Sequence, residues 1–255
     1  LRAASERLAG FGDRVELVHT GFDRIEELVN ERTTEGAIAV LMDLGVSSPQ
    51  LDDIERGFSY RGAAPLDMRM DRSQAMSAMD VVNDYSHSEL ARVLRNFGEE
   101  RFASRIARAI VDARPVLDTE QLADIVRSAI PAPARRTGGH PSKKSFQAIR
   151  MEVNKELDQL ATALDGALAS LAPGGRLAVM SYHSLEDRMV KSTLREAETG
   201  GCVCPPGLPC ACGAVPTVRL LKRGAWKASE DEIAVNRRAE SVRLRAAERL
   251  QEQAS

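Results

Sequence analysis

A polar segment directly follows the most apolar short run of the chain, and its side chains are of types that bind and orient ligands. Residues 37–42 are apolar and rich in branched side chains, as is typical of a strand buried on both faces of a sheet. Asp43 comes next, and residues 45–49 hold the glycine, serines and proline that end a strand in a turn. Because open parallel sheets bind ligands outside the carboxyl ends of their strands, we expect a site at residues 43–50. In the alternative interpretation, Asp43 and the serines only cap the next turn.

His183 is a second candidate, since it follows another predicted strand at residues 176–180. On that edge of the sheet it could accept a proton during a reaction. The local pattern also has a simpler interpretation: Ser184 with Asp187 three residues later is typical of a helix start. His183 would then be only a neighbour of the helix cap.

All four cysteines of the chain lie within eleven residues, in the pattern Cys-x-Cys-x5-Cys-x-Cys. In a reducing compartment, clustered thiols are more often metal ligands than disulfides, and four thiolates suit tetrahedral zinc. Such a zinc would be structural, because four thiolates leave no open coordination position. Cys-x-Cys is less diagnostic than Cys-x-x-Cys, so unligated thiols stay open as the alternative. The candidate ligands are Cys202, Cys204, Cys210 and Cys212.

Positive charge is unevenly distributed, although the formal net charge is only −2. Residues 131–150 contain no acidic side chain, and a second basic stretch covers residues 219–227. Basic patches of this kind bind nucleic-acid phosphates in a salt-sensitive manner, although an ordinary solvated face is the alternative for each. With 4% aromatic residues, an extended base-stacking platform is not expected. The cations of the first stretch are Arg135, Arg136, Lys143, Lys144 and Arg150; those of the second are Arg219, Lys222, Arg223 and Lys227.

Helix and strand patterns alternate at both ends of the chain. We predict a helix over residues 1–8, an extended segment at 15–18, a helix at 23–29 capped by Asp23, and the strand at 37–42. This order is typical of an α/β fold with a doubly wound parallel sheet. At 255 residues, the chain suits one large domain or one domain carrying an insertion.

The middle of the chain has helical spacing and no convincing strand. One predicted helix face carries Phe102, Ile106 and Ile110, and another carries Leu122, Ile125 and Val126. After it we predict one long helix over residues 146–171, a stop at 173–175, a strand at 176–180 and a helix from Ser184. The predicted domains are therefore a first α/β part at 1–60, a helical insertion at 61–145 and a second α/β part at 146–255.

Several long motifs closely resemble those of the bacterial 16S ribosomal RNA cytosine-N4 methyltransferase family, of RsmH/MraW type. Residues 43–52 read Asp-Leu-Gly-Val-Ser-Ser-Pro-Gln-Leu-Asp, and Gly-Phe-Ser and Pro-Leu-Asp-Met-Arg-Met-Asp follow at 57–59 and 65–71. Further matches are Phe-Gly-Glu-Glu-Arg-Phe-Ala (97–103), Phe-Gln-Ala-Ile-Arg (146–150), Ser-Tyr-His-Ser-Leu-Glu-Asp-Arg (181–188) and a closing strand at 236–245. The resemblance covers nearly the whole chain.

The resemblance implies a Rossmann-like class I S-adenosylmethionine-dependent methyltransferase fold with an inserted all-helical domain that holds the target cytidine. It also implies N4-methylation of a cytidine in the decoding centre of 16S ribosomal RNA. Phe22, Asp43 and Gln50 match the family's cofactor contacts. Ser47 and Ser48, in the same motif, are candidates for orienting the amine, and the basic stretch at 131–150 for binding RNA.

The family carries a Gly-Gly-His cofactor loop upstream of the point at which this sequence starts, and the sequence begins with Leu1. We therefore expect an N-terminally truncated chain that lacks part of its cofactor site. This leaves a non-catalytic RNA-binding or ribosome-assembly module as the alternative function. No apolar run reaches the roughly 18 residues of a membrane helix and no signal peptide is evident, so a cytoplasmic protein is expected. The expected partner is the small ribosomal subunit, and a homodimer is one option for the oligomeric state.

Overall fold

The computed structural model describes residues 1–136, 140–205 and 210–251 and divides into two compact units. The first, here called the sheet unit, comprises Leu1–Asp43 and Asp158–Ser255. The second, the helical unit, comprises Leu44–Leu157 and is inserted between them in the sequence. Within the described ranges, none of the helices combines the length and the apolar character needed to cross a bilayer.

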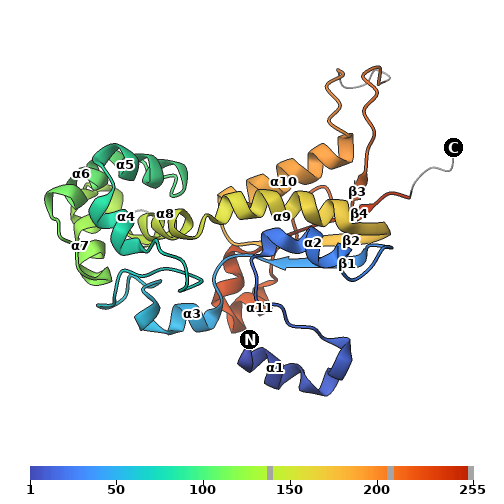
Figure 1. Ribbon diagram of the computed structural model, residues 1–255. Helices are drawn as coiled ribbons and strands as arrows, with labels where there is room; N and C mark the ends of the chain where they lie inside the picture. Colours follow the sequence, from blue (N-terminus) through green and yellow to red (C-terminus); the bar gives the residue numbers. More distant parts are fainter. Residues whose placement is uncertain (137–139, 206–209, 252–255) are drawn as a thin grey trace. The chain divides into compact units, whose positions relative to one another are not determined.

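The sheet unit contains four strands in the order β1-β2-β4-β3. Strands β1 (Ala37–Asp43) and β2 (Leu171–Ser181) are parallel, and Asp43 lies opposite Met180. Strand β4 (Arg243–Arg249) runs antiparallel to both β2 and β3 (Val218–Leu220). The carboxyl ends of β1 and β2 therefore meet at one edge of the sheet, as Figure 1 shows.

Strand β2 alternates in burial, with Leu177 and Val179 fully buried, because successive side chains point to opposite faces of the sheet. The helix does end before the predicted stop at residues 173–175, since α9 ends at Ser170, but β2 begins at Leu171 instead of residue 176 and includes this segment. The backbones of β1 and β2 approach so closely at Gly175 that only glycine fits: a Cβ on it would lie 2.6 Å from the carbonyl oxygen of Ala37. The pairing with β1 shifts register between Ala37 and Ala39, so the two strands pair irregularly near their starts.

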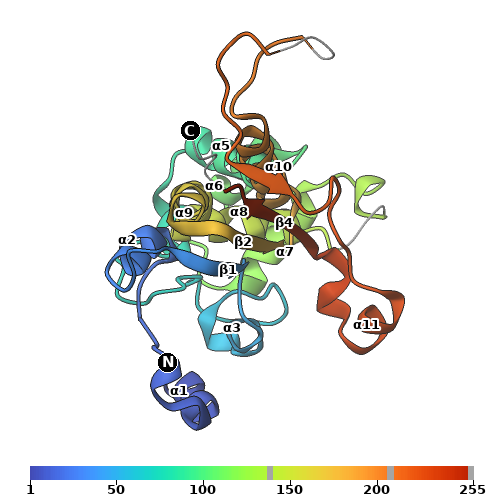
Figure 2. The same ribbon diagram turned by 90° about the vertical axis from the view of Figure 1, so that its right-hand side faces the viewer.

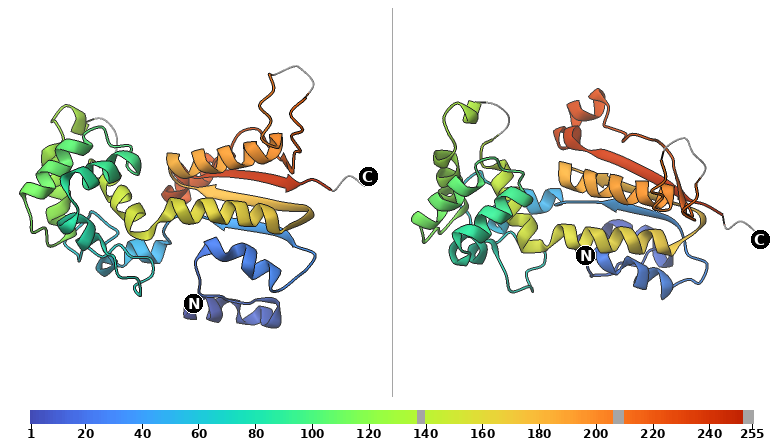
Figure 3. Two further views of the ribbon diagram at one scale, coloured as in Figure 1. Left: turned by 45° about the horizontal axis from the view of Figure 1, so that its top comes forward. Right: turned by 90° about the horizontal axis from the view of Figure 1, so that it is seen from above.

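Two long helices run along the strands of the sheet, α9 (Glu156–Ser170) and α10 (Ser184–Thr199), as Figure 3 shows. Val190 and Leu194 of α10 are buried, and this helix contacts β2, β3 and β4. The remaining helical segments of the sheet unit are short: α1 (Arg2–Leu8), α2 (Ile25–Asn30), α11 (Glu230–Val235) and the 3-10 turns Ala9–Arg14, Phe22–Arg24 and Arg237–Ser241.

Three predictions for the sheet unit are wrong in part. Residues 15–18 do not form a strand, because a strand needs the hydrogen bonds of a neighbour and they pair with no described strand. Asp23 does not cap α2; it lies inside the 3-10 turn Phe22–Arg24 that precedes the helix. The closing strand begins at Arg243 instead of 236, since the Asn236 side chain accepts a hydrogen bond from the Arg238 N–H and starts a 3-10 turn.

The predicted long helix over residues 146–171 is in fact two helices, α8 (Lys143–Asn154) and α9. The break falls at Lys155, whose backbone is left-handed with φ 51° and ψ 39°. A lysine in this conformation ends a helix at some cost, because its Cβ crowds the backbone. No glycine or proline marks the break in the sequence.

The helical unit contains α3 (Ser48–Asp52), α4 (Ala78–Asp84), α5 (His87–Asn96), α6 (Ala103–Asp112), α7 (Thr119–Ala129) and α8, with 3-10 turns at Ile54–Arg56 and Ala134–Arg136. No strand occurs in the part of this unit that the structure describes, as predicted. Both predicted faces are confirmed, since Ile106, Ile110, Leu122 and Val126 are fully buried in one core.

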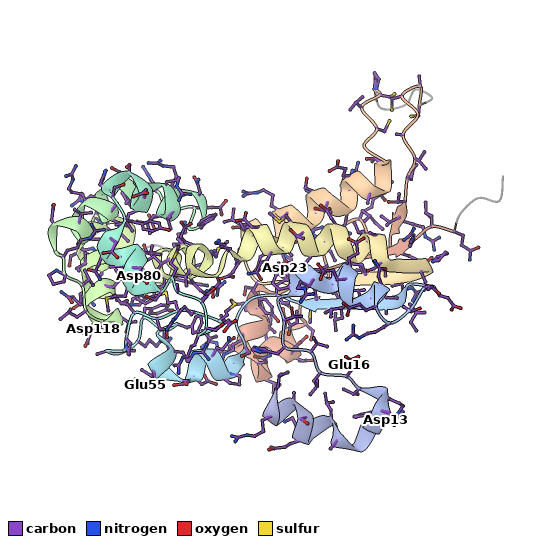
Figure 4. The ribbon with its side chains drawn as sticks, in the orientation of Figure 1. Asp13, Glu16, Asp23, Glu55, Asp80 and Asp118 are labelled. Atoms are coloured by element: carbon purple, nitrogen blue, oxygen red, sulfur yellow. The ribbon has the colours of Figure 1, made fainter. Side chains whose placement is uncertain are left out.

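Carboxylates lie at the starts of α4 and α7, where Figure 4 labels Asp80 and Asp118. Asp80 accepts hydrogen bonds from the N–H and hydroxyl of Ser77 and closes a capping box at the start of α4. Asp118 accepts from the Gln121 N–H at the start of α7. Such caps satisfy backbone donors that have no partner inside the helix.

Candidate active site

Asp43 ends β1 with an exposed carboxylate, as the sequence predicted. The Tyr182 hydroxyl donates a 2.8 Å hydrogen bond to Asp43 Oδ1. Tyr182 directly follows β2, so the parallel pairing of β1 and β2 places an acid and a phenol together at the carboxyl edge of the sheet unit. We call Asp43 and Tyr182 the sheet-edge pair. Its location is where an open parallel sheet binds its ligand.

Glu186, buried in the first turn of α10, holds the backbone that carries Tyr182. Its Oε2 accepts from the Tyr182 N–H at 2.8 Å and from the His183 N–H at 3.3 Å. An acid at this position also matches the positive end of the helix dipole. The side chain of Glu186 therefore fixes the turn from β2 into α10, and through it the position of the Tyr182 phenol.

The phenol of Tyr182 is protonated throughout the neutral range. Burial raises its pKa to about 12, and the hydrogen bond to Asp43 and the negative charge of that carboxylate act in the same direction. A neutral phenol can donate only one hydrogen bond, and here Asp43 receives it. Tyr182 is thus a positioning residue for Asp43.

Helix α10 begins at Ser184, as predicted, and His183 is its N-cap. Its Nδ1 accepts from the Glu186 N–H at 3.4 Å, and its Nε2 lies 3.0 Å from Glu186 Oε1. The pairing of a cap with an acid three residues later was correct in kind, but the cap is His183 and the acid is Glu186. Capping of α10 is therefore a structural role for His183. A catalytic role for it stays a prediction.

Phe22, the third predicted site residue of the sheet unit, lies at the start of the 3-10 turn Phe22–Arg24. Its side chain is 39% exposed, so a large part of the ring is open to a ligand. An exposed aromatic ring costs hydrophobic free energy unless something covers it. Its predicted contact with the cofactor is untested.

In the helical unit, Ser47 and Gln50 form a capping box at the start of α3. The N–H and the hydroxyl of Ser47 both donate to Gln50 Oε1, at 2.9 and 3.0 Å. Pro49 occupies the first turn, where its missing N–H costs nothing. The segment is therefore rigid, with Ser47 and Ser48 exposed. The Gln50 oxygen is engaged by this cap, which leaves its amide N–H groups as the atoms suited to a ligand.

Two further signature motifs of the helical unit pack against each other. Gly57 has a left-handed backbone with φ 70°, and a Cβ on it would lie 2.2 Å from the carbonyl oxygen of Pro65. The buried Asn154 side chain binds the second motif from both sides: Oδ1 accepts from the Met70 N–H at 2.7 Å, and Nδ2 donates to the Met68 carbonyl at 2.8 Å. Sequence reasoning missed Asn154, because these two partners in the motif lie more than 80 residues away.

The five predicted RNA-binding cations have different environments. Lys143 and Lys144 are exposed at the start of α8, and Lys144 Nζ donates to the Glu99 carbonyl. Arg135 donates to the Ile130 carbonyl near the end of α7. Arg150 forms a largely buried bidentate ion pair with Glu156, at 2.7 and 2.8 Å. Arg136 lies in the turn Ala134–Arg136, and its side chain is outside the described residues.

The four cysteines converge between α10 and β3 in the sheet unit. Their sulfur atoms all lie within 4.8 Å of one another, and none is in a disulfide. Hydrogen bonds from the backbone N–H groups of Val203 and Ala214 lower the pKa of Cys212 to about 6. The Cys204 N–H acts in the same direction on Cys202, but the Cys210 and Cys212 thiols outweigh it and raise the pKa of Cys202 to about 12.

The parallel strand pair with an acid at its carboxyl edge, the helices along the sheet and the inserted helical unit together define a Rossmann-like S-adenosylmethionine-dependent methyltransferase. The chain belongs to the MraW methylase family, whose sequence profile matches residues 1–250. The resemblance in the sequence motifs is thereby confirmed, and the chain is a methyltransferase.

Relatives named "Ribosomal RNA small subunit methyltransferase H" align with almost the whole chain. The protein of Thermobifida fusca is 55% identical over 256 residues, which cover 99% of this chain and 77% of the relative. The protein of Salinispora tropica is 56% identical, covering 98% and 68%, and that of Heliobacterium modesticaldum is 52% identical, covering 98% and 81%.

We predict that Tyr182→Phe weakens S-adenosylmethionine binding about 5- to 10-fold, because Asp43 loses the donor that fixes it. Calorimetric titration of the protein with the cofactor measures this. Tyr85→Phe is the matched control: the Tyr85 hydroxyl also donates to a carboxylate, Glu152, at 2.9 Å, but in the core of the helical unit. Equal losses in both variants, or no loss in Tyr182→Phe, would contradict a positioning role.

Proposed function

We propose that this methyltransferase transfers a methyl group from S-adenosylmethionine to N4 of a cytidine in the decoding centre of 16S ribosomal RNA, acting on the small ribosomal subunit in the cytoplasm. The names of the relatives support the RNA class, and the motif resemblance supports the base and the atom. The observation that carries the proposal is the sheet-edge pair, an exposed carboxylate held by a neutral phenol where the two parallel strands end.

The residues present fit the cofactor. Asp43 offers an exposed carboxylate that accepts hydrogen bonds from the hydroxyl or amino groups of the cofactor, and Phe22 offers an exposed ring that suits the adenine face. Gln50 offers amide donors, since its oxygen is engaged by Ser47. When bound, S-adenosylmethionine supplies an electrophilic methyl group on a sulfonium. The chain has to orient the nucleophile.

The N4 amine of cytosine attacks poorly, because its lone pair is delocalised into the ring. Orientation at near-attack distance can supply on the order of 7 to 11 kcal/mol of the barrier. Acceptors that bind the amine hydrogens favour a pyramidal nitrogen and stabilise the positive charge that develops on it. We assign this role to the Val46 carbonyl and the hydroxyls of Ser47 and Ser48, on a segment made rigid by Pro49 and the capping box.

The amine also loses a proton, and His183 is one candidate acceptor. Its Nδ1 accepts from the Glu186 N–H, so in the neutral ring Nε2 carries the hydrogen and lies 3.0 Å from Glu186 Oε1. Proton acceptance by His183 therefore requires Nδ1 to release the cap. His183→Gln therefore separates the two roles: lost turnover with normal cofactor affinity indicates proton transfer, and lost affinity indicates capping.

The target base has to be single-stranded or extruded from a helix before its amine can be reached. We assign phosphate contacts to Arg135, Arg136, Lys143, Lys144 and Arg150. We expect Lys143 and Lys144 to make most of these contacts, because both are exposed whereas Arg150 is already paired with Glu156. Removing one cation that binds a phosphate reduces the slope of log RNA affinity against log salt concentration by roughly one.

Methylation of small subunits from a strain that lacks this methyltransferase tests the proposed function. The subunits are incubated with the protein and methyl-labelled S-adenosylmethionine, and the RNA is digested to nucleosides for mass analysis. We expect one labelled nucleoside, N4-methylcytidine, from the decoding-centre fragment. Label in 5-methylcytidine, in another base or in a distant fragment would overturn the proposed atom or site.

A charge-reversal pair serves as a second arm of the same assay. Lys143→Glu with Lys144→Glu should lower RNA affinity and its salt dependence while cofactor affinity is unchanged. Arg2→Glu with Arg7→Glu on α1 gives the same change in net charge on another exposed helix. Similar losses in the two double variants would mean that only net charge matters.

A further inference from the structure

The segment between α10 and β3 is held by very few ordinary interactions. None of its described residues, 201–205 and 210–217, is buried, and Val203 and Val215 are 87% and 73% exposed. Hydrophobic burial therefore contributes little to its ordering, although fixing each backbone residue costs about 1 to 2 kcal/mol. Some other interaction has to hold the two arms, which Figure 2 shows projecting beyond the end of α10.

The base of the segment is closed tightly. Gly200 ends α10 with a left-handed backbone, and a Cβ on it would lie 2.4 Å from the Val215 carbonyl carbon. The Thr217 N–H donates to the Ala197 carbonyl at 2.9 Å. The arms thus start side by side, and each carries two cysteines with one residue between them, a spacing that places both side chains of an extended arm on the same side.

The sulfur atoms are placed as a metal would require. Cys202 Sγ lies 3.5 Å from Cys210 Sγ and 3.6 Å from Cys212 Sγ, and Cys210 Sγ lies 3.4 Å from Cys212 Sγ. These separations far exceed the length of a disulfide bond, about 2.05 Å. They are close to the edge of a tetrahedron with zinc–sulfur bonds of about 2.3 Å, which is about 3.8 Å. A small movement outward would accommodate one ion.

We infer that Cys202, Cys204, Cys210 and Cys212 bind one Zn²⁺ that clamps the two arms between α10 and β3. Four zinc–sulfur bonds form, and the protons of the thiols that are not already ionised pass to the solvent. The site is structural, because four thiolates complete a tetrahedral shell and leave no position for a substrate or water. The clamp acts on the link between α10 and β3.

The zinc content of the full chain tests this inference directly. The protein is purified without chelator and without a metal-affinity step, and its metals are measured by mass spectrometry. We expect about one zinc atom per chain, falling to less than about a tenth in the variant with all four cysteines changed to serine. Val203→Ala, an exposed residue of the same segment that offers no ligand, should keep the full zinc content.

A thiol titration of the wild-type protein keeps the test independent of the folding of any variant. The chain has four cysteines, all in this cluster, so every reactive thiol reports on the site. We expect slow reaction of the four thiols as purified and fast reaction after a zinc chelator is added. Cobalt in place of zinc should give the absorption of a tetrahedral thiolate complex. Four freely reactive thiols without metal, two disulfides, or iron in place of zinc would each overturn the inference.

Discussion

Asp43→Ala should weaken S-adenosylmethionine binding by between about 10-fold and about 150-fold, the range for a lost hydrogen bond to a charged group. Asp43 is the exposed acid at the carboxyl end of β1, and Tyr182 fixes it without neutralising it. The variant also leaves the Tyr182 hydroxyl without its acceptor, which adds to the loss. Calorimetric titration of the protein with the cofactor gives the change in affinity.

Glu35→Ala is the matched control for this variant. It removes the same charge from an exposed acid just before the opposite end of β1. Because long-range charge effects are screened within about 10 Å in ordinary buffers, only the Asp43 variant should lose affinity. Asp43→Asn, which keeps an oxygen for the Tyr182 hydroxyl, should fall between wild type and Asp43→Ala. Comparable losses at Glu35 and Asp43 would show that net charge, and not the sheet-edge pair, controls binding.

Asn154→Leu should lower the free energy of unfolding of the helical unit by about 2 to 5 kcal/mol. Leucine has a similar shape but no polar atoms, so the Met70 N–H and the Met68 carbonyl lose their partner, at about 1 to 3 kcal/mol each. Met68 is fully buried with a φ of 56°, and this strained conformation depends on its neighbours. Urea unfolding with hydrogen exchange at residues 65–71 measures the effect.

Asn96→Leu controls for the substitution itself. Asn96 is exposed at the end of α5 in the same unit, where a surface change typically alters stability by less than about 0.5 kcal/mol. Protection of the Met70 amide should be lost only in Asn154→Leu. If Asn154→Leu lowers the free energy of unfolding by less than about 1 kcal/mol, water replaces the asparagine and other contacts hold the motif at residues 65–71.

Local patterns predicted those parts of the molecule that depend on neighbours in the sequence. The apolar run before Asp43 became β1, and the apolar spacing at Ile106 and Ile110 marked the buried face of α6. Four cysteines in eleven residues indicated a cluster, and their sulfurs do converge. In each case the deciding interaction, burial of a periodic face or closure of a short segment, is local.

The misses depend on contacts between distant residues. The break at Lys155 follows an asparagine whose partners lie in the 65–71 motif, and no local signal marks it. Gly175 was interpreted as part of the stop between helix and strand, but it already lies in β2, where the backbone of β1 approaches closely. Tyr182 directly precedes the candidate His183, yet its role depends on Asp43, 139 residues earlier. Only the pairing of β1 with β2 brings these two together.

Ultraviolet cross-linking of labelled S-adenosylmethionine, followed by mapping of the labelled tryptic peptides, tests the central claim most directly. Cleavage after arginine isolates Phe22 in peptide 15–24 and places Asp43, Ser47 and Gln50 together in peptide 33–56. We predict label in these two peptides, with both signals removed by excess unlabelled cofactor. Competable label confined to other parts of the chain, with none in either peptide, would contradict the assignment of the cofactor to the carboxyl end of β1.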